Sequence, residues 1–287
     1  MARIKFMTDS VCDIPRHLLE GTDIQVLPFP IIFEDKEYLD GVDFTPDEFY
    51  PMLLEAPKIP SHAQHTSFYF FDQFEAVWND GYTDLIHTSI NSKGSSTFQN
   101  AVQAREEFYK TYPEAKETFH IYLLDSLTYT MGYGWAVLEG VKMAKNGASA
   151  QEVVDYMQDW IDHVRVVIVP LDLRFAKKSG RISAAAAFMG EALGLKPLMV
   201  FEDGVSKALN KVRGEKAAIK ALVELCQKER KEGTPYMIMR GNNLVQGQAL
   251  VDACTEALGQ APEVYYPFGG AVAINAGPNM IGMVYRT

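Results

Sequence analysis

Three apolar stretches determine the fold expected for this chain: IKFM at residues 4–7, DLIHTSI at residues 84–90 and FHIYLL at residues 119–124. Each stretch ends in a short polar loop, and a segment with helical periodicity follows from about Ile14, Ser96 and Tyr129, respectively. Repetition of strand, polar loop and helix is typical of a parallel β-sheet. Ligands of such sheets bind beyond the carboxyl ends of the strands. The sequence therefore predicts an α/β fold with a crevice at that edge.

An insertion is predicted between the first two of these units, at about residues 26–45. Residues 26–41 contain two apolar runs on either side of the charged tetrapeptide EDKE, and this pattern favours a β-hairpin. Thr45 and Pro46 then have the signature of a helix start, because a hydroxyl can cap the helix and proline fits its first turn.

The second half of the chain has a different pattern. Its apolar runs are short and separated by Gly and Pro, at residues 164–169, 197–201, 236–239, 264–266, 271–274 and 280–285. Asp203-Gly204 is a strong hairpin signal, and helices are expected at about 182–193 and 215–231. This mixture of strand pairs and helices predicts an α+β domain at residues 163–287. It follows a parallel-sheet α/β domain at residues 1–162, with a ligand in the crevice between the two.

Composition limits the classes of partner. The 287 residues include 27 Lys and Arg against 37 Asp and Glu, which gives a net charge of −10 and argues against nucleic acid. No run approaches the ~20 apolar residues of a membrane span, so stable membrane insertion is not expected. Cys12, Cys226 and Cys254 are odd in number and widely spaced, which favours a cytoplasmic location and neither a disulfide framework nor a zinc site.

Serine recurs where the predicted strands end, at Ser10, Ser92, Ser95 and Ser126. These hydroxyls, with the N–H groups of their loops, have the chemistry to bind a carboxylate or a phosphate. Alternatively, they cap the helices that follow. None of them lies in a Gly-x-Ser-x-Gly elbow, so a serine nucleophile is not favoured. Both interpretations remain open on the sequence alone.

His62 and His65 are three residues apart but have no nearby Asp, Glu or Cys to complete a metal site. One of them is expected to donate in the crevice while the other lies on the surface near a helix start, and a structural role for both is the alternative. After Gly180, an alanine-rich stretch at 184–187 fits close helix packing or a slender apolar ligand. No P-loop or Rossmann fingerprint is present, so no catalytic residue, metal or cofactor is assigned.

Several short motifs follow one another along the chain: Thr8-Asp9-Ser10, Asp40-Gly41-Val42-Asp43, Ser89-Ile90-Asn91-Ser92, Asp125-Ser126, Gly180-Arg181-Ile182-Ser183, Lys196-Pro197, Lys211-Val212-Arg213 and Gly277-Pro278. In this order they resemble the DegV family of bacterial fatty-acid-binding proteins over essentially the whole chain. The resemblance implies a carrier and not an enzyme. A long-chain fatty acid would lie in an apolar tunnel with its carboxylate at the crevice, where a separate ATP-dependent fatty acid kinase phosphorylates it for phospholipid synthesis.

The resemblance also implies roles for individual residues. Ser92 matches the serine that binds the carboxylate, and Arg181 matches an arginine near the head group. Arg213 matches an arginine involved in kinase docking. His62 stands where the family has Thr, and Asn275 stands where the family has His. We hypothesise that His62 and Asn275 have exchanged roles, and with Ser92, Ser95 and Arg181 they form the predicted ligand-binding set.

Two other functions stay open at this stage. The first is a dihydroxyacetone-kinase-like substrate subunit, in which a crevice histidine, here His62, binds the substrate carbonyl. The second is a regulatory protein whose crevice holds no lipid.

Overall fold

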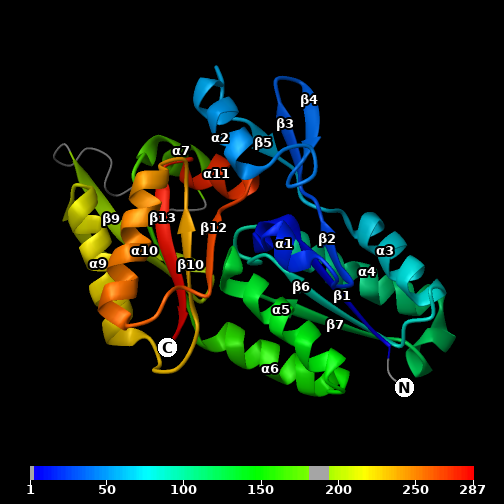
Figure 1. The fold of residues 1–287 in the computed structure, drawn as a ribbon. Helices are drawn as coiled ribbons and strands as arrows, with labels where there is room; N and C mark the ends of the chain where they lie inside the picture. The colour runs from blue at the N-terminus through cyan, green and yellow to red at the C-terminus, as the bar shows by residue number, and fades with distance from the viewer. Residues whose placement is uncertain (1–2, 181–193) are drawn as a thin grey trace.

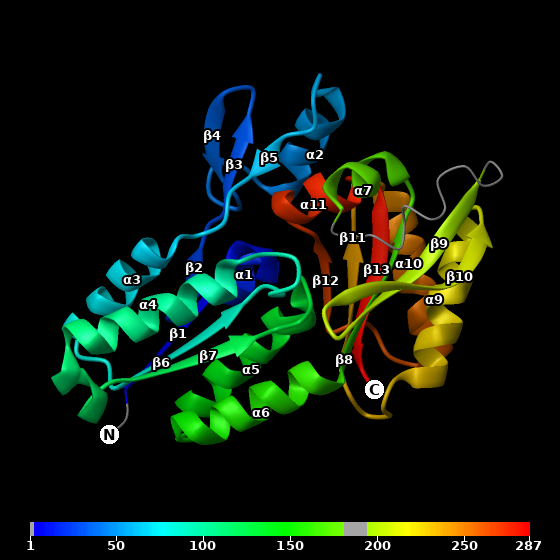
Figure 2. The same ribbon diagram turned by 180° about the vertical axis from the view of Figure 1, so that it is seen from behind.

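The computed structural model describes residues 3–180 and 194–287, and in these residues the strands form three sheets (Figures 1 and 2). The first is a parallel sheet in the order β2-β1-β6-β7. Its strands are β1 (Ile4–Asp9), β2 (Ile24–Leu27), β6 (Asp84–Ser89) and β7 (His120–Asp125). The three strands predicted from the apolar stretches are therefore confirmed.

Helices cover both faces of the parallel sheet (Figure 1). One face carries α3 (Ser67–Asn79) and α4 (Thr97–Thr111), and the other carries α5 (Met131–Lys145) and α6 (Ala150–His163). The helices expected after the second and third strands are α4 and α5. The helix expected from about Ile14 is only the single turn α1 (Arg16–Leu19), preceded by a 3-10 turn at Ser10–Cys12. Asp13 has a positive φ of 49° between the two, which prevents one continuous helix.

The insertion projects beyond the parallel sheet as a small lobe (Figure 1). It contains β3 (Pro30–Phe33), β4 (Lys36–Leu39), α2 (Pro46–Glu55) and β5 (Ser61–His62), paired in the order β4-β3-β5. The predicted hairpin is present, but its first strand starts later than expected, because Val26 and Leu27 pair with β1 in the parallel sheet. Thr45 caps α2 as predicted, in a reciprocal pair of hydrogen bonds with Glu48.

The second half of the chain forms a mixed sheet in the order β10-β9-β8-β13-β11-β12, antiparallel except between β11 and β12. Its strands are β8 (Val164–Pro170), β9 (Leu195–Glu202), β10 (Val205–Arg213), β11 (Tyr236–Arg240), β12 (Val264–Pro267) and β13 (Met280–Arg286). The hairpin predicted at Asp203-Gly204 joins β9 to β10. Helices α9 (Glu215–Glu229) and α10 (Leu244–Leu258) cover the outer face of this sheet (Figure 2).

The helices of this half agree only in part with those expected from the sequence. The helix expected at about 215–231 is α9, whereas α10 was not predicted. The apolar run at 271–274 is not a strand but part of the short helix α11 (Gly270–Ala276). The predicted helix at 182–193 and Arg181 lie outside the described residues, which resume at 194 after α7 (Leu173–Ser179).

The fold class of a parallel α/β sheet with a separate mixed sheet is confirmed. A domain boundary near residue 163, which remains a prediction, would fall between α6 and β8.

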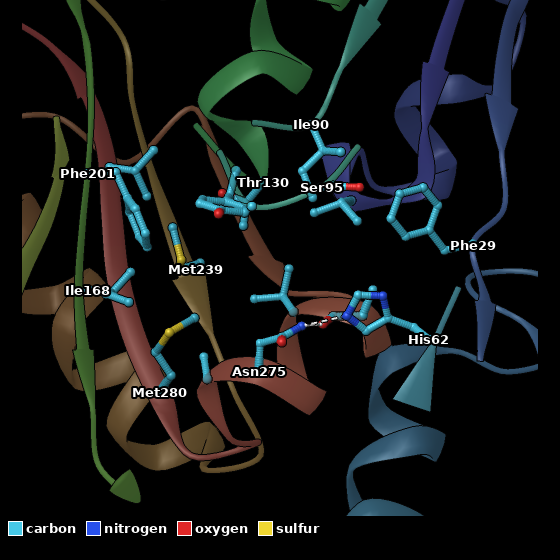
Figure 3. A pocket seen from close by; sticks show the side chains of 17 residues that line it. Phe29, His62, Ile90, Ser95, Thr130, Ile168, Phe201, Met239, Asn275 and Met280 are labelled. Carbon is cyan, nitrogen blue, oxygen red and sulfur yellow. Dashed lines mark hydrogen bonds between the residues drawn. The ribbon is translucent and has the colours of Figure 1, made fainter. Parts of the chain in front are cut away.

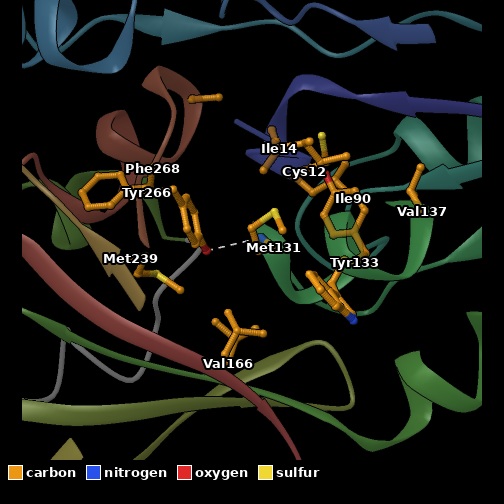
Figure 4. Packing of buried hydrophobic residues seen from close by; sticks show 14 of the residues in the cluster. Cys12, Ile14, Ile90, Met131, Tyr133, Val137, Val166, Met239, Tyr266 and Phe268 are labelled. Carbon is orange, nitrogen blue, oxygen red and sulfur yellow. Dashed lines mark hydrogen bonds between the residues drawn. The ribbon is translucent and has the colours of Figure 1, made fainter. Parts of the chain in front are cut away.

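The alternating side chains of β8 separate two hydrophobic cores. Val167 and Val169 belong to the cluster beneath α9 and α10, whereas Val166 and Ile168 face the N-terminal half. The core that contains Val166 and Ile168 continues across both halves of the chain (Figure 4). There the Tyr266 hydroxyl of β12 donates to Thr130 at 3.1 Å and accepts from the Met131 backbone N–H. The inner face of the mixed sheet therefore lies opposite the carboxyl ends of the parallel strands (Figure 2).

Candidate functional site

A narrow pocket lies between the two sheets, with a volume of about 610 Å³ that includes the part open to solvent. Its walls come from the loops after β6 and β7, from the insertion, from α11 and from the inner face of the mixed sheet (Figure 3). The lining residues are Val11, Phe29, His62, Ile90, Gly94, Ser95, Tyr129, Thr130, Val166, Ile168, Phe201, Met239, Ala271, Val272, Asn275, Ala276 and Met280. Most of these side chains are apolar, so the pocket suits a ligand that is largely hydrocarbon.

The polar end of the pocket contains His62 and Asn275, whose side chains point toward each other (Figure 3). The Asn275 amide nitrogen donates to the Ala271 carbonyl at 2.7 Å, and this bond sets the orientation of the amide because a carbonyl can only accept. The same nitrogen lies 3.0 Å from His62 Nε2. His62 Nε2 is therefore the acceptor, and we assign the neutral ring with its proton on Nδ1.

The opposite end is apolar and belongs mainly to the mixed sheet. Ile168 of β8, Phe201 of β9, Met239 of β11 and Met280 of β13 present their side chains to the pocket (Figure 3). Phe201 also meets the ring of Tyr129 edge-on, with 4.7 Å between the ring centroids. Inward-facing positions of neighbouring strands lie side by side on one face of a sheet. These residues from four strands therefore form one continuous wall.

Ser95 lines the pocket, and it also takes part in the start of α4. Its hydroxyl accepts a hydrogen bond from the Thr97 backbone N–H at 3.3 Å and lies 2.8 Å from the Thr97 hydroxyl. The next residue, Ser96, donates its backbone N–H to the Gln64 side chain at 3.0 Å. This contact ties the loop after β6 to the segment that carries His62. The capping and ligand-binding interpretations of Ser95 are thus compatible in space.

Ser92 lies in the same loop, half-buried, but it does not belong to the pocket lining. Its backbone N–H donates to Asp125 at 3.0 Å, so the loops after β6 and β7 are joined at this point. Two other strand-end serines have internal partners. The Ser10 hydroxyl donates to Asp40 at 3.0 Å, and the Ser126 hydroxyl donates to the Thr128 carbonyl at 3.1 Å.

The remaining predicted residues lie elsewhere. Arg213 is exposed at the end of β10, where it pairs with Leu195 at the start of β9. Arg181 lies outside the described residues. The expectation of a surface position for one of the two histidines is wrong, because His62 is half-buried and His65 is only 6% exposed. Burial lowers the pKa of His65 to about 4, so this ring is neutral near pH 7.

Known proteins resemble this chain in sequence and in fold. The sequence model of the DegV family, whose description reads "Uncharacterised protein, DegV family", matches residues 3–287. The chain belongs to the DegV family. A DegV domain-containing protein of Caldanaerobacter subterraneus subsp. tengcongensis is 35% identical over 224 residues, which cover 78% of this chain and 76% of that protein.

Solved structures similar to this DegV chain show the same fold. A fatty-acid-binding DegV family protein from Thermus thermophilus superimposes with a TM-score of 0.88, at 24% identity over 99% of this chain and 100% of the other. The fatty acid kinase (Fak) B3 protein of Streptococcus pneumoniae, loaded with linoleic acid, gives a TM-score of 0.85 at 20% identity. That match covers 100% of this chain and 99% of the other.

Sequence reasoning missed one feature of this DegV fold, the buried carboxyl groups of Asp9, Asp13 and Asp40. Burial raises the pKa of Asp9 to about 6, although the Tyr133 hydroxyl donates to it at 2.6 Å. Burial raises the pKa of Asp40 to about 6 as well. Burial and the charge of Asp40 raise the pKa of Asp13. The motifs Thr8-Asp9-Ser10 and Asp40-Gly41 contained this signal, but a sequence pattern cannot show that these carboxyl groups are buried.

In the part of the chain that the structure describes, no three His, Cys, Asp or Glu side chains gather in a way that would hold a metal ion. Over the same ranges, none of the helices combines the length and the apolar character needed to cross a bilayer.

Proposed function

We propose that this DegV protein binds one long-chain fatty acid in the pocket between its sheets and presents the carboxylate to a separate ATP-dependent fatty acid kinase. The observation that carries the proposal is a pocket with an apolar wall from the mixed sheet and polar side chains at one end. The names of the Thermus and Streptococcus proteins, which share this fold, point to the same class of ligand.

The apolar wall accounts for retention of the hydrocarbon tail. Burial of a chain of about sixteen methylenes at ~0.8 kcal/mol each contributes over ~10 kcal/mol gross, before the costs of association and ordering. Side chains such as Ile168 and Met280 offer no hydrogen bonds, so the tail and not the head group belongs at their end.

The head group belongs at the end with His62, Asn275 and Ser95. A carboxylate in a partly buried position needs hydrogen-bond donors, because desolvation without them is costly. In the tautomer assigned above, His62 Nδ1–H is a donor, and the Ser95 hydroxyl is another. Ser92 is proposed to contribute from the adjoining loop, and Arg181 from the alanine-rich segment. The exchange of roles between His62 and Asn275 is supported by their direct contact at 3.0 Å.

Phosphoryl transfer is assigned to a partner. The chain contains no P-loop or kinase signature of its own. A carboxylate near the mouth of the pocket would attack the γ-phosphoryl group of ATP held by the kinase, and the product would be an acyl phosphate and ADP. Arg213, exposed at the end of β10, is proposed to contact that kinase.

The geometry disfavours the dihydroxyacetone-kinase-like alternative. Attack on a substrate carbonyl requires a free lone pair on an imidazole nitrogen. In His62, the lone pair of Nε2 accepts the hydrogen bond from Asn275, and Nδ1 carries the proton. The dihydroxyacetone-kinase-like alternative is therefore not carried forward.

The proposal is tested by the lipid that the protein retains. Protein purified from a lipid-replete host is denatured, extracted with organic solvent and analysed by mass spectrometry. We expect close to one equivalent of a long-chain fatty acid per chain. Absence of fatty acid, together with no binding of added palmitate or oleate by calorimetry, would reject the proposal and leave the regulatory alternative.

A further inference from the structure

We infer that Asp40 is a positioning residue for the head-group end of the pocket, and that it orients the pair His62 and Asn275 from two sides. Asp40 touches neither residue directly. It acts through α11 on one side and through Phe29 on the other. The inference rests on the proposed function only in taking His62 and Asn275 as neighbours of the ligand's head group.

The first route runs through the start of α11. The Asp40 carboxylate accepts hydrogen bonds from the backbone N–H groups of Gly270 at 3.0 Å and Ala271 at 3.3 Å. The carbonyl of the same Ala271 accepts the hydrogen bond from the Asn275 amide, which sets the amide's orientation toward His62. Fixing Ala271 therefore fixes the group that Asn275 presents to the imidazole.

The second route runs through Ser10 and Phe29. The Ser10 hydroxyl donates to the Asp40 carboxylate at 3.0 Å and accepts from the Phe29 backbone N–H at 3.1 Å. The Asp40 backbone N–H donates to the Phe29 carbonyl at 2.9 Å. The Phe29 ring stacks on His62, with 6.2 Å between centroids and 20° between the planes. Asp40 thus fixes the surface on which the imidazole lies.

The contact with α11 depends on two glycines. A Cβ atom on Gly270 would lie 2.9 Å from the Asp40 carboxylate, and one on Gly269 would lie 2.6 Å from the Asp13 carboxylate. Asp13 accepts the Gly269 N–H at 2.9 Å, so two carboxylates from the N-terminal half bind three consecutive N–H groups of the C-terminal half. Asp40 is 3% exposed. A buried carboxylate is costly unless its acceptor bonds are made, so its orientation is closely constrained.

The test uses Asp40→Asn, which keeps the shape of the side chain but replaces one acceptor oxygen by a donor. Asp43→Asn is the matched control, because Asp43 is exposed in the same loop and accepts from the Leu39 backbone N–H within that loop. The first measurement is the imidazole ¹⁵N spectrum of His62 in lipid-free protein. We expect the Nδ1-protonated tautomer in the unsubstituted protein and in the control, and a mixture of tautomers in Asp40→Asn.

The second measurement compares the affinity for palmitate with that for hexadecanol, which has the same tail without the carboxylate. We expect Asp40→Asn to reduce the palmitate-to-hexadecanol affinity ratio about tenfold, with hexadecanol binding changed by less than about threefold. General destabilisation would weaken both ligands alike. An unchanged tautomer and an unchanged ratio in folded Asp40→Asn would overturn the inference.

The two measurements separate this inference from the proposed function. If the unsubstituted protein binds neither palmitate nor hexadecanol, the proposed function fails, and the tautomer of His62 alone decides the inference. If Asp40→Asn does not fold, Ser10→Ala takes its place, because it removes the hydroxyl that links the Asp40 carboxylate to the Phe29 backbone N–H. A change in the His62 tautomer in Ser10→Ala then supports the inference, and an unchanged tautomer rejects it.

Discussion

The two sheets approach the pocket in different ways. The parallel sheet contributes loops at the carboxyl ends of its strands, including Gly94, Ser95 and Tyr129. The mixed sheet contributes its face, through residues such as Ile168 and Met239. Loops carry hydroxyl groups and backbone N–H groups that do not belong to a ladder, whereas a sheet face offers only side chains. An amphiphile is therefore oriented by the sheet architecture, with its head group toward the loops and its tail along the sheet face.

The largest effect is expected from filling the sheet face. Ile168→Trp adds a bulky side chain where the tail is proposed to lie, and should lower the affinity for a long-chain fatty acid by at least about 100-fold, with overpacking costing roughly 1–3 kcal/mol of stability. Ile168→Val is the control, because it keeps the shape of the wall and should change affinity by less than about threefold. Calorimetric titration with palmitate measures both. Undiminished binding by folded Ile168→Trp would place the tail elsewhere.

The loop side is tested by Ser92→Ala. If the Ser92 hydroxyl binds a partly buried carboxylate, its removal should weaken fatty acid retention by roughly 1–3 kcal/mol. Ser96→Ala is the matched control in the same loop, since Ser96 is exposed and makes its contact with Gln64 through the backbone. Competitive displacement of a fluorescent fatty acid gives the affinities. Equal affinities for the two variants would reduce Ser92 to a structural residue of the loop.

Substitution of Arg213 tests whether the kinase contacts the mixed sheet outside the pocket. Arg213→Ala should leave fatty acid affinity unchanged, because Arg213 does not line the pocket, and should lower phosphorylation by the kinase about tenfold. Lys220→Ala is the control, since it removes an exposed cation from the neighbouring helix α9. Acyl phosphate is measured by trapping with hydroxylamine. Loss of lipid binding in Arg213→Ala would mean that its role has been misassigned.

A pH-dependent effect on stability is expected from the buried carboxyl groups of Asp9, Asp13 and Asp40. In the folded protein the pKa of Asp9 is about 6, above the value of about 3.9 in an unfolded chain. The folded state therefore binds more protons between about pH 4 and 6, and this group's contribution to unfolding free energy increases as pH falls through that window. For one proton the slope is at most about 1.4 kcal/mol per pH unit.

Asp9→Asn removes one of these carboxyl groups and should flatten that part of the profile. Denaturant unfolding of both proteins between pH 4 and 8 gives the comparison. Asp72→Asn serves as a control, because Asp72 is exposed on the surface of α3. Identical profiles for Asp9→Asn and the unsubstituted protein would show that Asp9 does not titrate in this window.

Prediction from sequence was most accurate for elements with a local signal. The apolar stretches at 4–7, 84–90 and 119–124 became parallel strands, and the turn at Asp203-Gly204 became a hairpin, because period and turn chemistry are local properties. The run at 271–274 misled, since a short apolar run fits a strand or a buried helix equally well. In the structure, the first N–H groups of this helix donate to the carboxylate of Asp40, 230 positions away in the sequence.

The sequence by itself determined the succession of strand, loop and helix, the acidic charge, and which loops carry serine and histidine, because these are set by neighbouring residues and composition. Only the tertiary structure decided that His62 meets Asn275, that the alternate residues of β8 face a pocket, and that Asp40 caps α11. The contact of His62 with Asn275 joins residues 213 positions apart, and that of Asp40 with α11 joins residues 230 positions apart. Their formation depends on how two sheets pack against each other, and no local pattern encodes that packing.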